Sequence, residues 1–272
     1  MISDQTPLVV LTVAGFDPSG GAGVLADIKT IAAFGCYGVA AISGITFQNT
    51  LGVNGAASEN PLIVRQQLAP LFDDFEIAAV KTGMLPTAEI VHEVAGLIRK
   101  RATPVVVVDP VLRSTSGFDL LDHAAIDALV TQLFPLASLI TPNRFEAAVL
   151  SGVQIENQLH AERAANAILK TGAQAVLITG GDTDTDVSID LLRDKDGSAV
   201  FSSEHIESKN THGTGCTFAS ALACLMALGQ PPRDAIPIAK GYIRQAISNA
   251  PGLGRGQGPL NHFPPGFNLS VK

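Results

Sequence analysis

The sequence predicts an α/β fold with a mostly parallel central sheet covered by helices on both faces. Two observations support this prediction. Short continuous apolar runs alternate with longer amphipathic segments from one end of the chain to the other, and turn residues such as glycine and proline separate them. The 272 residues contain no linker, low-complexity stretch or internal repeat, so we expect a single domain over residues 1–272.

In the first half of the chain, the predicted strands are mostly apolar runs of the kind that is buried on both faces of a sheet. They are Leu8–Ala14, Tyr37–Phe47, Glu76–Lys81 and Pro104–Val108. Between them, helices are predicted from helical spacing of apolar residues or from a proline just inside a cap. They are Val24–Phe34, a helix that starts at Asn60-Pro61, and Thr87–Lys100.

In the second half, helices are predicted around Arg144–Leu150 and His160–Lys170, and the last third is largely helical. Strands are predicted at Leu139-Ile140 and Gln174–Thr179, followed by a hairpin. Its strands, Val187–Arg193 and Ala199–Ser203, flank the turn at residues 194–197. Because ligands bind at the carboxyl ends of strands in such sheets, the polar residues there are candidates. They are Asp17, Gln48, Lys81, Asp109 and Asn143.

Composition and charge exclude several classes of protein. The chain is 46% apolar and 16% charged, which argues against disorder, and its net charge of −7 gives no broad basic surface for nucleic acid. The odd cysteine set, Cys36, Cys216 and Cys224, has no metal-type spacing and fits a reducing compartment. With no signal-type start and no apolar run of membrane-spanning length, we expect a cytoplasmic protein without a membrane partner.

The most informative segment is Thr-His-Gly-Thr-Gly-Cys at 211–216, which runs directly into the apolar stretch Thr217–Leu228. Glycines let main-chain N–H groups converge there, and the following helix adds the positive end of its dipole. The segment therefore predicts a pocket that holds an anion, and phosphate is the usual one. Cys216 would lie in the first helical turn, where a thiol pKa tends to be lowered. Together these features indicate phosphoryl transfer to a hydroxyl.

The glycine-rich turn at 17–23 allows several interpretations. Gly21, Gly23 and Ala26 fit the spacing of a dinucleotide fingerprint, but the acidic residue expected about 20 residues later is absent. A phosphate loop fails as well, because Gly21 stands where lysine is required. Two interpretations remain open: a tight turn that needs glycine for backbone reasons, and a substrate loop in which Asp17 and Asp27 face a small polar ligand.

Other polar clusters are weaker. Asn143 and Glu146 form either a helical capping box or, through Glu146, a site that holds magnesium through water. The aspartates at 182–190 do not form a calcium loop, because the glycine at position six is missing and Arg193 replaces the bidentate glutamate. We interpret His212 as a satisfied loop histidine rather than a base.

A set of motifs follows in one specific order along nearly the whole chain. They are AGFDPSGGAG at 14–23, ADIKT at 26–30, QNT at 48–50, GML at 83–85, DPV at 109–111, TPN at 141–143, NTHGTGC at 210–216 and GRGQGPL at 254–260. This set resembles the hydroxymethylpyrimidine/phosphomethylpyrimidine kinases of thiamine biosynthesis, within the ribokinase superfamily. Two positions depart from the family pattern: Thr179 stands where lysine is usual, and Phe16 replaces a small polar residue.

The resemblance implies a ribokinase-like three-layer α/β/α fold, with ATP and Mg²⁺ as cofactors. It implies phosphorylation of 4-amino-5-hydroxymethyl-2-methylpyrimidine and then of its monophosphate, giving the diphosphate. These small molecules and ATP would be the partners of the chain, and a homodimer is expected because dimers are common among the relatives. The alternative within the superfamily is a pyridoxal/pyridoxine-type vitamin kinase. From other classes, a nicotinamide oxidoreductase and a binding protein without catalysis remain alternatives.

The resemblance also implies roles for individual residues. Gln48 would hydrogen-bond the pyrimidine, since an amide offers a donor and an acceptor. Cys216 takes the position at which most ribokinase relatives have an aspartate base. The other matched positions are the substrate wall (Asp27, Gly15 and Met84), the anion hole (Gly213, Thr214 and Gly215) and the cofactor site (Asn143, Glu146 and Asp109, the last two near magnesium through water). The loops expected to close over the site are Asn49–Ala57 and Asp182–Asp190.

Overall fold

The structure is a computed structural model that describes residues 6–114, 117–180 and 187–267. The strands in these ranges are β1 Val9–Phe16, β2 Tyr37–Asn49, β3 Gly52–Ser58, β4 Ile77–Thr82, β5 Val106–Val108, β6 Leu139–Ile140, β7 Ala175–Ile178, β8 Val187–Asp194 and β9 Gly197–Glu204. They form one sheet in the order β3-β2-β1-β4-β5-β6-β7-β8-β9. The six central strands, β2-β1-β4-β5-β6-β7 in their order across the sheet, pair in parallel. At the two edges β3, β8 and β9 join antiparallel. The predicted mostly parallel sheet is confirmed.

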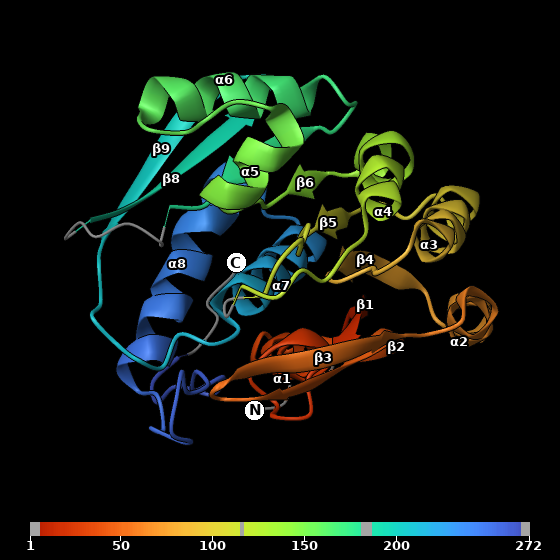
Figure 1. Ribbon diagram of the computed structural model, residues 1–272, viewed down its shortest axis with the longest axis horizontal. Coiled ribbons are helices and arrows are strands. Elements are labelled where there is room, and N and C mark those ends of the chain that lie inside the picture. Colours follow the sequence, from red (N-terminus) through yellow and green to blue (C-terminus); the bar gives the residue numbers. More distant parts are fainter. Residues whose placement is uncertain (1–5, 115–116, 181–186, 268–272) are drawn as a thin grey trace.

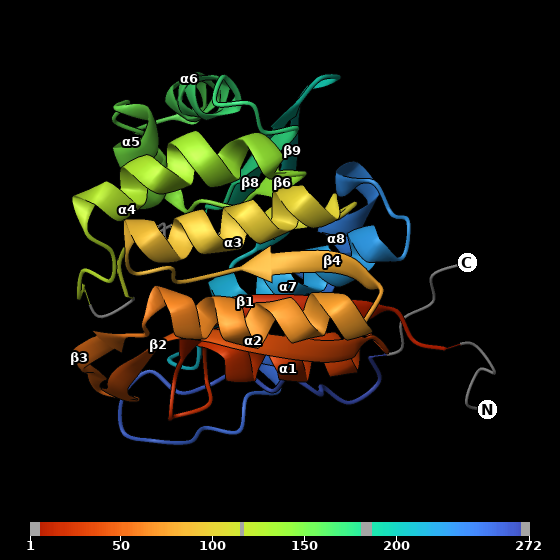
Figure 2. The ribbon, with the colours of Figure 1, turned by 90° about the vertical axis from the view of Figure 1, so that its right-hand side faces the viewer.

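Helices cover both faces of this sheet, which makes three layers (Figure 1). One face carries α2 Pro61–Asp74, α3 Ala88–Arg101, α4 His123–Ala128, α5 Arg144–Ser151 and α6 Gln158–Leu169, with the short turns η1 Leu129–Leu133 and η2 Phe134–Leu136. The other face carries α1 Gly23–Ala33, α7 Thr214–Ala227 and α8 Pro232–Ser248. Figure 2 shows α2, α3 and α4 lying side by side across the first face.

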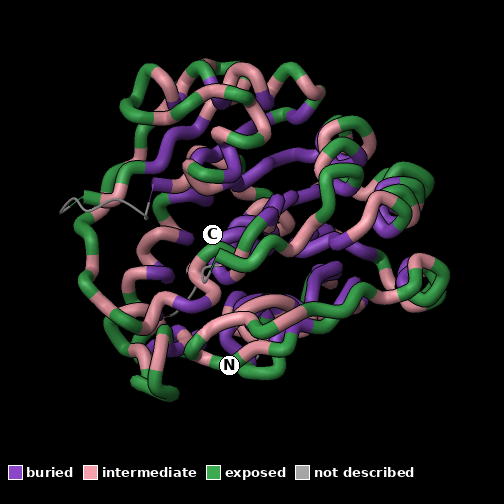
Figure 3. Tube along the Cα trace, in the orientation of Figure 1, coloured by how far each residue is buried: buried purple, intermediate pink, exposed green. Residues whose placement is uncertain are grey.

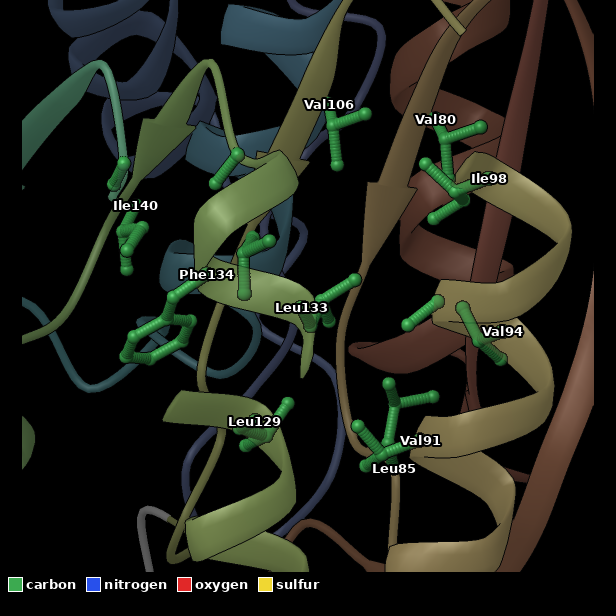
Figure 4. Close-up of a cluster of buried hydrophobic side chains, with 14 of the residues drawn as sticks. Val80, Leu85, Val91, Val94, Ile98, Val106, Leu129, Leu133, Phe134 and Ile140 are labelled. Atoms are coloured by element: carbon green, nitrogen blue, oxygen red, sulfur yellow. The ribbon is translucent and has the colours of Figure 1, made fainter. Parts of the chain in front are cut away.

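The two faces of the sheet contribute to two separate apolar cores. In β5, Val106 and Val108 pack into the core under α3, while Val107 between them packs into the core under α7. Figure 4 shows Val106 and Val80 of the sheet facing Ile98 of α3. Successive side chains of a strand point to opposite faces, so a strand that is covered twice is mostly apolar, and polar side chains in it, such as Thr12 and Lys81, need buried partners. Along the chain trace in Figure 3, the central strands are mostly buried, whereas the edge strands and the outer faces of the helices are exposed or intermediate.

Two local features differ from the sequence prediction. The glycine-rich segment expected to be a closing loop at 49–57 instead contains most of the edge strand β3, which pairs with β2. Its side chains are largely exposed, so it has no apolar run to reveal it. The helical stretch from α4 to η2 was not predicted. Of the second candidate closing loop, residues 181–186 lie outside the described ranges, and 187–190 belong to β8.

In the described residues, no helix has the length and apolar character required to cross a bilayer. The last third is only partly helical, because the segment after α8 is irregular up to residue 267. That segment packs back on the second core. His262 is 4% exposed, its Nε2 lies 3.3 Å from the Thr217 hydroxyl, and its carbonyl accepts a hydrogen bond from Tyr242 at 2.8 Å.

We predict that His262 makes the stability of the protein sensitive to acid. Burial lowers the pKa of His262 to about 4, with a smaller contribution from Lys29. The unfolded chain binds this proton near pH 6.5, so the stability present above that pH is lost as the pH falls toward 4. Between pH 7 and pH 5 the loss due to this group is about 2 kcal/mol. Urea unfolding at both pH values should show a smaller loss for His262→Gln than for the native chain. Equal losses would contradict the prediction.

Candidate active site

The carboxyl ends of the parallel strands meet at one edge of the sheet, and a cavity of about 690 Å³ lies along that edge. Its wall runs from the ends of β1 and β2 past β5 and β6 to β7 and the β8–β9 ribbon. A cavity of this size takes a small organic ligand. Most of the residues predicted for the site line it. They are Gly15, Gln48, Met84, Asp109, Asn143, Glu146, Gly213, Thr214, Gly215 and Cys216.

The turn at 211–216 enters α7 through Gly213, which has a left-handed φ of +82°. A Cβ atom on Gly213 would lie 1.8 Å from the carbonyl oxygen of Gly21, so only glycine fits this contact. The amides of Gly215 and Cys216 fall in the first helical turn, where no carbonyl of the helix can accept from them. The turn therefore presents N–H groups and the helix dipole to the cavity, as an anion site requires.

The glycine-rich turn after β1 packs against this anion turn. Asp17 holds its fold: the carboxylate accepts hydrogen bonds from the amides of Ser19 at 2.8 Å and Ala22 at 2.9 Å. Together with the contact between Gly21 and Gly213, these bonds support the interpretation that the glycines serve the backbone. Asp17 lines the cavity, but its oxygens are already engaged by the protein.

Asp17 also binds His212, and His212 reaches Gln48. The Nε2 atom of His212 lies 2.8 Å from Asp17 Oδ2 and 3.1 Å from the Gln48 amide nitrogen. Burial pushes the pKa of Asp17 upward, but hydrogen bonds from His212 and Ser19 outweigh it and hold the pKa below its usual value. From the sequence alone, His212 is interpreted only as a satisfied loop histidine. Its position directly before Gly213 was the signal that could have marked it.

Gln48 stands where the pairing of β2 with β3 shifts by one residue, between Phe47 and Gln48. Such irregularities re-aim side chains and are common beside active sites. Thr46 and Gln48 both line the cavity, and the Thr46 hydroxyl lies 3.1 Å from the Gln48 amide oxygen. The exposed Phe47 between them does not line it.

Asp27 departs from its predicted place in the substrate wall, because it is fully buried and does not line the cavity. Its carboxylate accepts from Thr12 at 2.6 Å, from Ser220 at 2.8 Å and from Lys81 at 3.0 Å to each oxygen. Burial alone would lower the pKa of Lys81, but the charge of Asp27 and further negative neighbours raise it above its usual value. This fully buried pair therefore keeps Lys81 charged.

The ion pair adjoins the catalytic candidates. Lys81 Nζ lies 3.7 Å from Asp109 Oδ2, and Cys216 lies close enough to both for their charges to act on its thiol. Burial raises the pKa of the thiol to about 12; Lys81 opposes this, but Asp109 and Asp27 add to it. The predicted lowering of the Cys216 pKa is therefore wrong. That prediction relied on the helix dipole, whose effect on the thiol pKa is smaller than the combined effect of burial and two neighbouring carboxylates.

Glu146 and Asn143 form the capping box of α5, one of the two interpretations given by the sequence. Glu146 accepts from the amides of Asn143 at 2.9 Å and Leu112 at 3.3 Å. Asp109 Oδ2 is buried without a hydrogen-bond donor, and burial raises the pKa of Asp109 to about 6 against the effect of Lys81. Across the described residues, no cluster of three or more potential metal-ligating side chains exists.

The two residues that depart from the family pattern both line the cavity. Thr179 follows β7, pairs with Asn143 and donates its amide to the carbonyl of Pro142 at 2.9 Å. The cations at this end of the cavity come from α8 instead. They are Lys240, paired with Asp190 at 2.5 Å, and Arg244, paired with Glu204 at 3.0 Å. Phe16 closes β1 and accepts from the Thr46 hydroxyl through its carbonyl at 3.3 Å.

Comparison with known proteins agrees with this geometry. The family model of phosphomethylpyrimidine kinase matches residues 17–261. The chain belongs to this family. A hydroxymethylpyrimidine/phosphomethylpyrimidine kinase of Rhizobium meliloti is 42% identical over 94% of the chain and 97% of the relative. The family predicted from the ordered motifs is thus confirmed.

Two further relatives widen the comparison. The thiamine biosynthesis bifunctional protein ThiED of Geobacter sulfurreducens is 46% identical over 93% of the chain, and the chain spans 52% of its length. A structure of the pyridoxal kinase of Staphylococcus aureus in complex with AMP-PCP and pyridoxal has a TM-score of 0.87 and 32% identity, with 95% of each chain covered. The predicted ribokinase-like fold is confirmed by this likeness.

We predict that the Lys81–Asp27 pair is costly to break and much less costly to remove. Lys81→Met leaves two carboxylates without their buried cation, which destabilises the protein by about 3–5 kcal/mol. Adding Asp27→Asn removes one of these charges, so the double variant should recover a large part of the loss. Urea unfolding of the native chain and both variants measures this difference. A double variant no more stable than Lys81→Met would show that the unpaired charge of Asp27 is not the cause of the lost stability.

Proposed function

We propose that this kinase phosphorylates the hydroxymethyl group of 4-amino-5-hydroxymethyl-2-methylpyrimidine with ATP, and then converts the monophosphate to the diphosphate for thiamine diphosphate biosynthesis. The observation that carries the proposal is one cavity that contains both the anion turn before α7 and the amide of Gln48. Family membership supports the reaction class. The AMP-PCP complex of the Staphylococcus aureus relative supports an ATP site. The chain would act as one catalytic domain, in the cytoplasm and as a homodimer.

In this proposal the γ-phosphate of ATP sits at the amides of Gly215 and Cys216, with Gly213 and Thr214 shaping the turn. The oxygen of the substrate hydroxyl would form a bond to the γ-phosphorus while the bond from that phosphorus to the bridging oxygen breaks, which releases ADP, and the hydroxyl proton would pass to water. The transition state is largely dissociative, so positioning and charge stabilisation outweigh proton removal. The thiol of Cys216 is neutral because burial raises its pKa, so we assign Cys216 to shaping the wall of the cavity rather than to proton abstraction.

The cofactor end of the cavity would use Asn143, Glu146 and Asp109. Asp109, with its unbonded buried oxygen, and Glu146 fit a magnesium ion held through water. When bound, the ion would neutralise charge on the ATP phosphates. At the substrate end, Gly15, Met84 and Gln48 would line the pyrimidine, while Asp27 would act indirectly by holding Lys81.

We predict that Gly213→Val harms turnover at least as much as Cys216→Ala. A side chain at Gly213 collides with the Gly21 carbonyl and displaces the amides, and such donors contribute about 3–4 kcal/mol in other enzymes. The thiol removed by Cys216→Ala is neutral and acts by positioning. Turnover numbers for both variants, with folding checked by circular dichroism, make the comparison. Near-normal turnover in a folded Gly213→Val variant would show that the phosphate does not bind at this turn.

We predict that Gln48→Ala weakens binding of the pyrimidine far more than binding of ATP. The lost amide leaves polar groups of the ring unpaired, which costs about 1–3 kcal/mol. Titration calorimetry with each ligand separately measures both losses. Equal losses of affinity for the two ligands would show that Gln48 does not recognise the pyrimidine.

An ATP-consumption assay with the pyrimidine alcohol tests the proposal directly. Pyridoxal serves as the second substrate, because a pyridoxal kinase of the same fold provides the alternative. We expect faster turnover of the pyrimidine alcohol and formation of both the monophosphate and the diphosphate. Faster turnover of pyridoxal would favour the alternative, and no ADP with either alcohol would contradict both.

A further inference from the structure

His212 connects the loop after β1 to the amide that would recognise the substrate. Its Nε2 lies 2.8 Å from Asp17 Oδ2 and 3.1 Å from the Gln48 amide nitrogen. His212 is 7% exposed and Asp17 is 3% exposed, so the protein itself must satisfy these atoms. The ring packs closely against Gly21, since a Cβ atom at that position would lie only 2.3 Å from its Cδ2. The histidine amide is also fixed, since it donates to the carbonyl of Gly258 at 3.1 Å.

The neighbours of His212 decide which nitrogen carries the proton. Asp17 accepts from the amides of Ser19 and Ala22 and from the Ser19 hydroxyl, so it is an ionised carboxylate that can only accept. Hydrogen bonds also keep the pKa of Asp17 low, although burial opposes them. Nε2 must therefore carry a hydrogen and donate it toward Asp17. The other tautomer would place two lone pairs against each other at 2.8 Å.

This assignment determines the orientation of the Gln48 amide. Two N–H groups cannot hydrogen-bond, so the amide oxygen must face His212, where it shares the single Nε2 hydrogen with Asp17 in a three-centre hydrogen bond. A half-turn about the terminal bond exchanges the oxygen and nitrogen at little steric cost. The nitrogen then donates to the Thr46 hydroxyl, 3.1 Å from the other end of the amide, and that hydroxyl donates to the Phe16 carbonyl. In this arrangement His212 Nε2, the Gln48 amide oxygen and nitrogen, and the Thr46 hydroxyl each have a partner.

We propose that His212, held by Asp17, is a positioning residue that sets substrate specificity by fixing which end of the Gln48 amide donates and which accepts. The inference rests on the proposed function. One lone pair of the amide oxygen and one N–H remain for the ligand, in a fixed order. An aminopyrimidine edge presents a ring-nitrogen acceptor beside an amine donor. The corresponding 4-oxo pyrimidine presents the reverse order, an N–H donor beside an oxygen acceptor, and should be rejected.

The test compares kcat/KM for the amino alcohol and its 4-oxo analogue. Sites built to hydrogen-bond a substrate group reject a mismatched analogue strongly, so we expect the native chain to prefer the amino form by at least about 100-fold. In His212→Met, which has no donor, the amide turns freely and this preference should fall at least about tenfold. The change should appear mainly in KM for the pyrimidine, with KM for ATP unchanged. His212→Gln restores an N–H donor and should keep most of the preference.

The outcomes separate this inference from the proposed function. If the native chain turns over the amino alcohol but His212→Met keeps the native preference, the inference is wrong and the function stands. It is also wrong if His212→Gln loses as much preference as His212→Met, since the donor would then be irrelevant. If His212→Met does not fold, Asp17→Asn takes its place, because an amide no longer imposes the proton on Nε2, and an unchanged preference again overturns the inference. If the native chain does not turn over the amino alcohol, both the proposed function and this inference are wrong.

Discussion

The contact between the Gly21 carbonyl and Gly213 is the constraint on which the site depends. It joins the loop after the first strand to the start of α7, almost two hundred residues later in the chain. The same packing brings the ring of His212 against Gly21 and Asp17. One close approach of backbone therefore positions both the anion turn and the group that orients Gln48. The glycines of the first loop serve this fit rather than a nucleotide of their own.

Beside this contact lies a buried cluster of charges that sets the protonation of the residues in the site. Lys81 is shared between Asp27 and Asp109, and the Cys216 thiol lies next to all three. Removing charges from water is costly, and mutual attraction with hydrogen bonds from Thr12 and Ser220 offsets that cost. Asp27 thereby acts at a distance: it keeps Lys81 charged, and Lys81 in turn balances Asp109.

Much of the fold could be predicted from the sequence because the spacing of apolar residues and the residues that favour turns are local features. The apolar run Val106–Val108 could belong only to a strand covered twice, and Asn60-Pro61 and Thr87 mark helix starts where α2 and α3 begin. The exposed edge strand β3 has no such signal. In the site, the residues on strand ends and on the anion turn were predictable, whereas the burial of Asp27 and the high pKa of Cys216 were not. Both depend on neighbours from distant strands and helices, such as Thr12, Lys81 and Ser220.

The high pKa of Cys216 has a consequence for chemical durability. Alkylating reagents and peroxides attack the thiolate, and a thiol with a pKa near 12 is almost entirely protonated in neutral solution. A cysteine that lines such a cavity would ordinarily make the protein vulnerable to oxidative inactivation. Here burial, with a smaller effect of Asp109 and Asp27, suppresses that reactivity, so the sulfur that faces the ligands is a weak nucleophile.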